Sequence, residues 1–163
     1  MNTNKARISD IPIVIELHKR LLYKSATVNT EEFWHEFEMS CEKYYTEAMK
    51  SDKFIAYLAM EDNIPVGFAA MSYYEICPTA NNMSGNNTIL TDLYVIPEYR
   101  CQGIGYKLLT AIMEQAKMDS YRKVTLNATE LGKPLYEKYG FSDVSGEMSY
   151  KFFDQRNIWF ENG

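Results

Sequence analysis

The sequence predicts an α/β (α+β) fold with one mixed sheet, and two observations support this fold class. Apolar residues at helical spacing alternate along the chain with short runs rich in β-branched and aromatic residues. In the second half, an extended segment, a helical segment and another extended segment follow one another within residues 88–127. Such a crossover connection is right-handed and leaves its two strands parallel or nearly so.

The first half of the chain predicts two helices and a hairpin. A capping residue and a proline open a run of apolar residues at helical spacing, which predicts a helix over residues 10–22. A second helix is expected over residues 31–50, because a capping residue and acids in the first turn precede an aromatic face. The β-rich runs KFIAYLAMED and IPVGFAAMSYYEI meet at Asp62 and Asn63, which predicts a hairpin.

The second half predicts two more helices and the remaining strands. A loop rich in Asn, Pro and Gly over residues 77–87 precedes them. The expected elements are a strand at 88–96, a helix at 103–118, a strand at 123–127, a helix at 131–139 and a closing strand pair at 141–144 and 148–153. No linker or repeat interrupts the pattern, so we expect a single domain over residues 1–163 with a polar tail at 154–163.

The composition suits one globular domain and argues against polyanionic partners. A chain of 163 residues with 46% hydrophobic and 24% charged residues can bury a sizeable core. Its 17 basic residues are outnumbered by 22 acidic ones, which gives a net charge of −5. This balance provides no general attraction to nucleic acid or to an anionic membrane, so we expect neither as a partner.

The cysteines and the N-terminus predict a soluble cytoplasmic protein without a metal site. Cys41, Cys77 and Cys101 are odd in number and widely spaced, which fits neither a disulfide framework nor a metal knuckle. The N-terminal residues are polar, and no apolar run approaches the ~18 residues that a membrane span needs.

The stretch TDLYVIPEYRCQGIGYKLL begins a helix without an ordinary N-cap. A helix N-terminus leaves about four backbone N–H groups unpaired, and Arg100, Cys101 and Gln102 are poor caps for them. Gly103 and Gly105 lack the β-carbons that would keep a ligand away, so the N–H groups can face an anion such as a phosphate. The alternative is a tight strand-to-helix turn in which glycine serves packing alone.

Two known phosphate-binding motifs do not fit this stretch. The dinucleotide fingerprint needs a third glycine and a later acid, and both are missing. The nucleoside triphosphate loop needs a longer gap between its glycines and a Gly-Lys-Ser/Thr ending. A phosphate bound here therefore belongs to another kind of cofactor.

Two segments together resemble the GNAT superfamily of acyl-CoA-dependent N-acyltransferases. LYVIPEYRCQGIGYKLL is similar to the pyrophosphate signature, in which a strand ends in Val-x-Pro before Arg-x-x-Gly-x-Gly and a helix. PLYEKYGF, residues 134–141, resembles the second signature, and the two occur in family order and spacing. The resemblance covers the chain up to Phe153. It implies a mixed, mostly antiparallel central sheet of about six to seven strands, flanked by about four helices and splayed between its two central parallel strands.

The resemblance also implies how acetyl-CoA would bind. The backbones of Leu93, Tyr94 and Val95 would bind the pantetheine arm, which lies beside the strand like an added strand. The far side of the cofactor would be held by Asn127 or Thr129. The N–H groups that would bind the pyrophosphate, with Arg100 beside them, belong to Cys101, Gln102, Gly103, Ile104, Gly105 and Tyr106.

The family's usual general acid corresponds to Tyr136. A phenol beside the thioester sulfur can protonate the departing thiolate, an effect worth about 10² to 10⁴ in rate. Tyr139, where the family commonly has leucine, and the Tyr106 side chain are interpreted as packing residues. Cys101 is not expected to act as a nucleophile, because no histidine is paired with it in the sequence and the phosphate occupies the same helix terminus.

The general base is not fixed by the sequence. Family members often carry an acid or a histidine at the places of Ile89 and Thr91, and neither of these residues can serve. Asp92 is adjacent, but strand alternation turns it to the opposite side unless a β-bulge rotates it. Glu75 at the end of the preceding strand and a chain of waters are the other candidates. The segment from Asp92 onward nonetheless resembles that of diamine and polyamine acetyltransferases, where an acid meets the amine.

The function that the resemblance implies is transfer of an acetyl group from acetyl-CoA to a primary amine, directly in a ternary complex. The acceptor is expected to be a small molecule, and a small polycationic amine would suit the acids near the predicted cleft. The alternative is a non-catalytic acyl-CoA-binding sensor or interaction module of the same fold. Homodimers are frequent in the family. His18 and His35 are interpreted as surface residues of the front helices.

Overall fold

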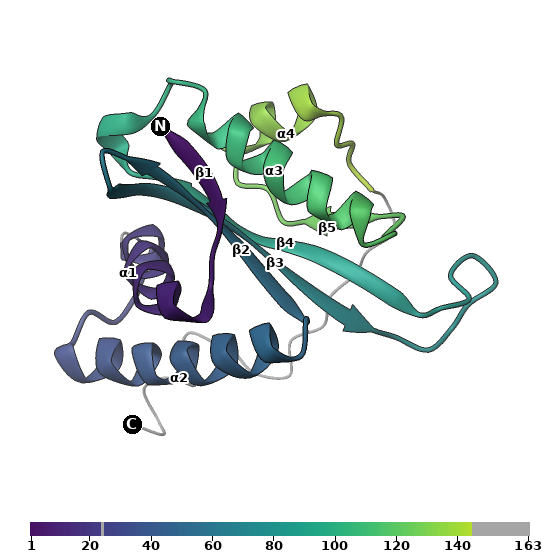
Figure 1. The fold of residues 1–163 in the computed structure, drawn as a ribbon, viewed down its shortest axis with the longest axis horizontal. Helices are drawn as coiled ribbons and strands as arrows, with labels where there is room; N and C mark the ends of the chain where they lie inside the picture. Colours follow the sequence, from purple (N-terminus) through teal and green to yellow (C-terminus); the bar gives the residue numbers. More distant parts are fainter. Residues whose placement is uncertain (24, 145–163) are drawn as a thin grey trace.

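A five-stranded sheet separates two layers of helices in the structure, a computed structural model that describes residues 1–23 and 25–144 (Figure 1). The strands are β1 (Asn2–Lys5), β2 (Phe54–Glu61), β3 (Ile64–Glu75), β4 (Asn86–Val95) and β5 (Val124–Leu126). The helices are α1 (Ile11–Leu22), α2 (Glu31–Lys50), α3 (Ile104–Met118) and α4 (Lys133–Tyr139), with short 3₁₀ turns at Ile8–Asp10 and Pro97–Tyr99. The strands follow chain order across the sheet, antiparallel from β1 to β4, and β5 runs parallel to β4. This arrangement confirms the predicted α/β class with a mixed, mostly antiparallel sheet.

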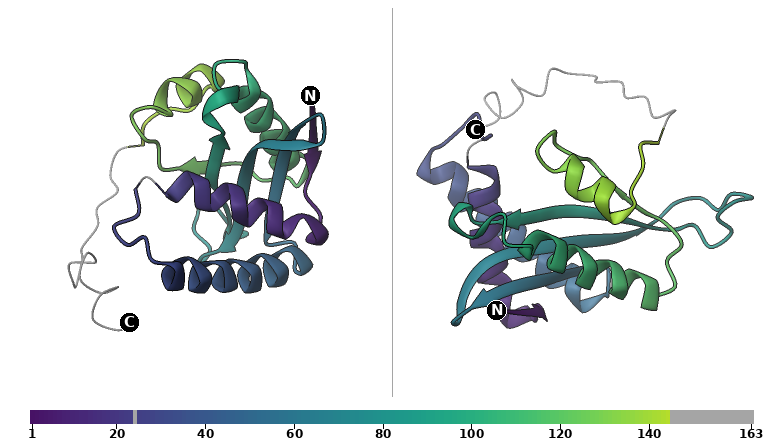
Figure 2. Two further views of the ribbon diagram at one scale, coloured as in Figure 1. Left: turned by 90° about the vertical axis from the view of Figure 1, so that its left-hand side faces the viewer. Right: turned by 90° about the horizontal axis from the view of Figure 1, so that it is seen from above.

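The two faces of the sheet carry separate apolar cores. Helices α1 and α2 cover one face, where Phe68 and Tyr94 are buried (Figure 2). Helices α3 and α4 cover the other face, where Met71 and Leu108 are fully buried. Because both faces of the central strands are covered, these strands are apolar over most of their length. None of the helices in the described residues has the length and apolar character that a bilayer crossing requires.

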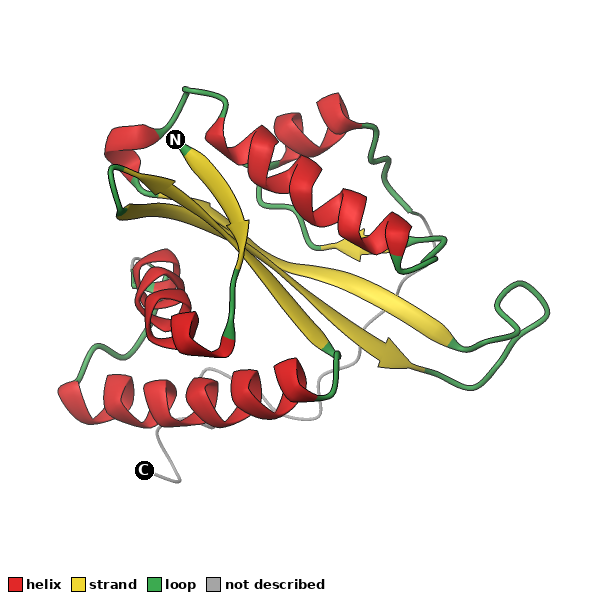
Figure 3. Cartoon of the chain, in the orientation of Figure 1, coloured by secondary structure: helices red, strands yellow, loops and turns green. Residues whose placement is uncertain are grey.

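The local signals in the sequence are realised at the helix and hairpin ends. The Thr30 side chain accepts a hydrogen bond from the Phe33 N–H at 3.2 Å and so caps α2. Asp62 and Asn63 have φ angles of 47° and 64°, the left-handed pair that a two-residue hairpin turn needs. Beyond the helices, β3 and β4 continue as a long hairpin, which Figure 3 shows projecting from the sheet.

Three details of the predicted fold differ from the structure. The described residues contain five strands rather than six or seven. Residues 141–144 form no strand, and the expected partner at 148–153 lies outside the described residues. A strand not predicted, β1, pairs with β2 through the register Asn2 to Met60. It is mostly exposed at the sheet edge, which allows a polar sequence that carries no strand signal.

Candidate active site

The sheet opens between β4 and β5. Strand β5 pairs with β4 only through Thr88, Ile89 and Leu90. Further along β4, residues 93–95 pair with β3 on one side, but no described strand pairs with their other side. At Gly67 of β3 an added Cβ would lie 2.6 Å from the Tyr94 carbonyl oxygen, so the two strands stay close at this point. The edge of residues 93–95 that no described strand covers therefore faces the opening, and the Val95 carbonyl accepts a hydrogen bond from Arg100.

The turn before α3 forms a nest of free backbone N–H groups. The N–H groups of residues 101–106 donate no hydrogen bond to any other part of the described chain, and α3 begins without a side-chain cap. Cys101 and Gly103 have φ angles of 60° and 78°, which turn successive N–H groups toward one side. A Cβ added at Gly103 would meet no atom within 4 Å, so the space beside it is open. These six groups are suited to an anion such as a pyrophosphate.

Of the other predicted cofactor residues, two already make hydrogen bonds within the chain and one is exposed beside the opening. The Arg100 guanidinium lies over the Tyr94 ring, and its Nε donates to the Val95 carbonyl oxygen at 2.9 Å, so it is already engaged with β4. Asn127 is exposed immediately after β5, at the opening. The Thr129 Oγ1 accepts a hydrogen bond from the Gly132 N–H at 3.2 Å and helps to begin α4, so it serves the fold.

Helix α4 holds Tyr136 at the opening. The helix ends at Gly140, whose φ of 118° allows the Phe141 N–H to return to the Tyr136 carbonyl at 3.0 Å. The Tyr136 ring packs edge-on against Phe141 at a centroid distance of 5.9 Å. Burial raises the pKa of Tyr136, and the charge of Asp92 raises it further. The phenol is therefore protonated at neutral pH and lies within electrostatic reach of Asp92.

A β-bulge in β4 directs Asp92 toward α1. Ala70 of β3 lies opposite Asp92, whereas Met71 lies opposite Leu90, so Thr91 is the additional residue. Its hydroxyl donates to the Ala70 carbonyl at 3.2 Å. Leu90 and Tyr94 would face the same side of a regular strand, yet they belong to the cores on opposite faces. The bulge that the sequence left open is therefore present, and it puts Asp92 on the same face as Tyr94.

His18 contacts Asp92, which corrects its interpretation as a helix-surface residue. Its Nε2 lies 3.4 Å from the Asp92 Oδ1, and its side chain is only 16% exposed. Its Nδ1 lies 2.7 Å from the hydroxyl of the buried Tyr45. His18 occupies the apolar stripe of α1, four residues after Val14 and three after Ile15, and this spacing is the signal that could have revealed it. His35, by contrast, is exposed as predicted.

The remaining candidate base, Glu75, lies elsewhere. It is exposed at the far end of β3, where its carboxylate is 3.9 Å from the Lys53 Nζ. It lies five positions along β3 from Ala70, the partner of Asp92, which corresponds to roughly 16 Å along the strand. The structure therefore does not bring Glu75 to the opening. Within the described ranges, no group of three or more His, Cys, Asp or Glu side chains is placed to hold a metal ion.

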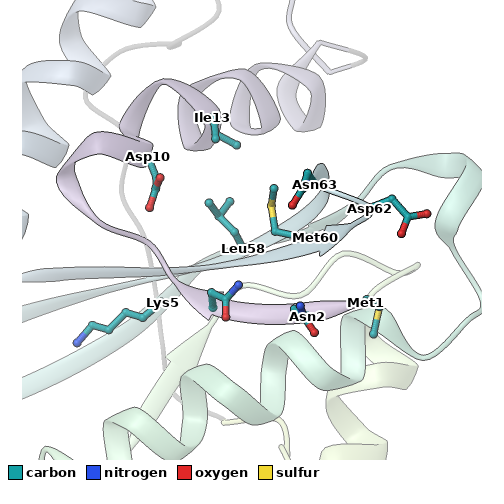
Figure 4. A pocket seen from close by; sticks show the side chains of 10 residues that line it. Met1, Asn2, Lys5, Asp10, Ile13, Leu58, Met60, Asp62 and Asn63 are labelled. Carbon is teal, nitrogen blue, oxygen red and sulfur yellow. The ribbon is translucent and has the colours of Figure 1, made fainter.

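Two hollows of the described surface lie away from the opening. One is polar and lies between β1, the start of α1 and the β2–β3 turn, where Asp10 and Asp62 line it (Figure 4). Because β1 and β5 are at opposite edges of the sheet, this hollow is at the edge away from the opening between β4 and β5. The other lies under the loop of the β3–β4 hairpin and is lined by Met83 and Tyr121. Neither contains a predicted site residue.

Comparison with known proteins identifies the class that this fold and site define. Residues 21–154 match the sequence model of the GNAT acetyltransferase domain, so the chain belongs to the GNAT acetyltransferase family. It is 24% identical over 156 residues to the uncharacterized N-acetyltransferase YhfO of Bacillus subtilis, covering 92% of this chain and 95% of YhfO. It is 32% identical over 98 residues to thialysine Nε-acetyltransferase of Mus musculus, and this match spans 56% of the chain but only 55% of the mouse protein.

Solved structures agree with the family assignment. A predicted acetyltransferase from Clostridium acetobutylicum, solved with acetyl-CoA, superposes with a TM-score of 0.82 at 26% identity, covering 92% of this chain and 95% of that one. An aminoglycoside N-acetyltransferase in complex with CoA has the same fold, with a TM-score of 0.71 at 16% identity, covering 92% of this chain and 93% of that one.

Proposed function

We propose that the protein transfers the acetyl group of acetyl-CoA to a primary amine, directly in a ternary complex at the opening between β4 and β5. The observation that carries the proposal is the combination at one opening of six free N–H groups, an unpaired strand edge, the Tyr136 phenol and the Asp92 carboxylate. The nest would hold the pyrophosphate and the edge of β4 the pantetheine arm, which together direct the thioester toward Asp92 and Tyr136. The solved relative with acetyl-CoA supports this choice of donor.

The proton balance gives Asp92 and Tyr136 complementary roles. An alkylammonium with a pKa of about 10.4 is only ~10⁻³ deprotonated near pH 7.4, a deficit of about 4 kcal/mol unless the site assists proton loss. The amine nitrogen bonds to the carbonyl carbon and the C–S bond then breaks. Of the two protons that the ammonium loses, Asp92 receives one, and the other replaces the proton that Tyr136 gives to the departing sulfur.

We further propose that the acceptor is a small multiply cationic amine, such as a diamine. Asp92 is mostly buried, with 11% of its side chain exposed, and within the described residues its only ion-pair contact is to His18. Burial lowers the pKa of His18, although Asp92 opposes the shift, so the imidazole leaves the carboxylate charge uncompensated at neutral pH. A buried carboxylate without a cation is costly, and a substrate ammonium would relieve that cost.

The test compares specificity constants for 1,4-diaminobutane and a neutral amino acid amide of similar size, at low and high salt. We expect the diamine to be preferred and Asp92→Asn to lower its constant by about 10- to 100-fold, as for loss of a hydrogen bond to a charged group. The control is Glu75→Gln, which removes a negative charge from the same sheet away from the opening. An advantage that is absent, or that survives both added salt and Asp92→Asn, contradicts the proposed acceptor class.

A further inference from the structure

His18 connects the proposed catalytic carboxylate to a buried tyrosine. The imidazole projects from α1 between Asp92 of β4 and Tyr45 of α2, and its two nitrogens contact one partner each. Phe37 packs edge-on against the ring at 5.2 Å, and Phe68 lies at 6.2 Å. With both nitrogens and the ring in contact, the orientation of His18 is fixed by three elements.

The chemistry of the partners sets the direction of the hydrogen bond to Tyr45 and places the hydrogen in the 3.4 Å contact with Asp92. A neutral imidazole has one N–H and one acceptor nitrogen. The nitrogen that faces the Asp92 oxygen must carry the hydrogen, because two lone pairs would repel each other. Nδ1 is then the acceptor for the Tyr45 hydroxyl, and Cys41 packs against the same apolar cluster as Tyr45. Burial raises the pKa of Cys41 to about 11 and that of Tyr45 as well, so both groups remain protonated donors.

We propose that His18 is a positioning residue, whose Nε2–H holds one oxygen of Asp92 and leaves the other oxygen for the acceptor amine. This inference rests on the function proposed above. Without the contact, the Asp92 carboxylate is free to rotate about its side-chain bonds, and a reacting group displaced by about 1 Å loses on the order of 10²-fold in rate. His18 then acts on turnover through Asp92 and not by accepting the substrate proton itself.

Two amide variants separate the two nitrogens of His18. In His18→Gln the side-chain amide reaches about as far as Nε2 and can donate to Asp92. In His18→Asn the amide matches Nδ1 in reach and can accept from Tyr45, but it falls short of Asp92. We expect kcat within about 5-fold of the wild type for His18→Gln and about 10²-fold lower for His18→Asn, with acetyl-CoA affinity unchanged in both. An equal loss in the two variants overturns the positioning role, because only His18→Gln keeps a donor that reaches Asp92.

A measurement without turnover keeps the inference testable if a variant does not fold. The ¹⁵N shifts of the wild-type imidazole at pH 7.5 are expected to show hydrogen on Nε2 and an acceptor at Nδ1, and Tyr45→Phe is expected to shift Nδ1. Hydrogen on Nδ1, or a charged ring, overturns the proposed contact. Full turnover in Asp92→Asn contradicts the proposed catalytic function instead, so failure of the inference and failure of the function are distinguished.

Discussion

Tyr136→Phe removes the proposed acid while keeping the packing of the ring. The hydroxyl makes no hydrogen bond with the described residues, and the ring contact with Phe141 is available to phenylalanine. The fold and the affinity for acetyl-CoA should therefore change little. Loss of general acid catalysis lowers kcat by about 10² to 10⁴, which corresponds to about 2.7 to 5.4 kcal/mol of activation free energy.

The assay is steady-state release of CoA thiol, accompanied by calorimetric titration of acetyl-CoA. The matched control is Tyr139→Phe, which removes a hydroxyl one turn further along α4, where the ring packs against Tyr106 at 5.7 Å. The control should retain wild-type turnover. Because burial raises the pKa of Tyr136, the wild-type enzyme should also keep its acid through pH 9. A Tyr136→Phe protein within a few-fold of the wild type refutes the reasoning and assigns the proton to water or another group.

Three further predictions follow from the nest and from the cluster around Asp92. Gly103→Ala should weaken CoA binding and, because the φ of Gly103 is 78°, should lower the free energy of unfolding by about 1 kcal/mol. The control Gly140→Ala should also lower stability but should leave CoA affinity unchanged. Equal CoA affinities in the two variants contradict the nest. Burial raises the pKa of the Cys41 thiol to about 11, so alkylation at pH 8 should modify Cys41 more slowly than the two exposed cysteines. Equal alkylation rates measured by mass spectrometry contradict the burial of Cys41. Because the pKa of His18 is lowered in the fold, the unfolded chain binds a proton first as pH falls below about 6.5, and stability is lost there. Between pH 7.5 and 5.5, the free energy of unfolding measured in urea should fall less for His18→Gln than for the wild type. Identical losses of stability in the two proteins contradict the lowered pKa of His18.

The parts of the fold that depend on local chemistry could be predicted from the sequence. The Asp62–Asn63 turn and the uncapped start of α3 are encoded by residues that tolerate left-handed backbone or lack a β-carbon. The edge strand β1 is not predicted because its stability comes from pairing with β2, whose partners run from Met60 for Asn2 to Tyr57 for Lys5, and not from its own polar residues. The expected strand at 141–144 is not formed, and its expected partner at 148–153 lies outside the described residues.

In the site, too, features encoded by local sequence could be predicted, whereas features that depend on distant partners could not. The N–H nest and Tyr136 lie within continuous motifs, so the sequence predicts their positions directly. The direction of Asp92 depends on the bulge at Thr91, and a single additional residue reverses every side chain beyond it. The contact of His18 with Asp92 requires α1 to pack across β4, which residue spacing can suggest only as burial and not as a specific partner.

The proposed acetyl transfer is tested most directly by amine-dependent thiol release from acetyl-CoA. The purified protein would be titrated with acetyl-CoA and CoA by calorimetry and then assayed with polyamines, amino acids including thialysine, aminoglycosides and short peptides. We predict binding of both thioester and thiol, and release of CoA that depends on a multiply cationic amine and is reduced about 10- to 100-fold in Asp92→Asn. Tight binding of acetyl-CoA without release of thiol by any amine would contradict catalysis and indicate an acyl-CoA-binding module of the same fold.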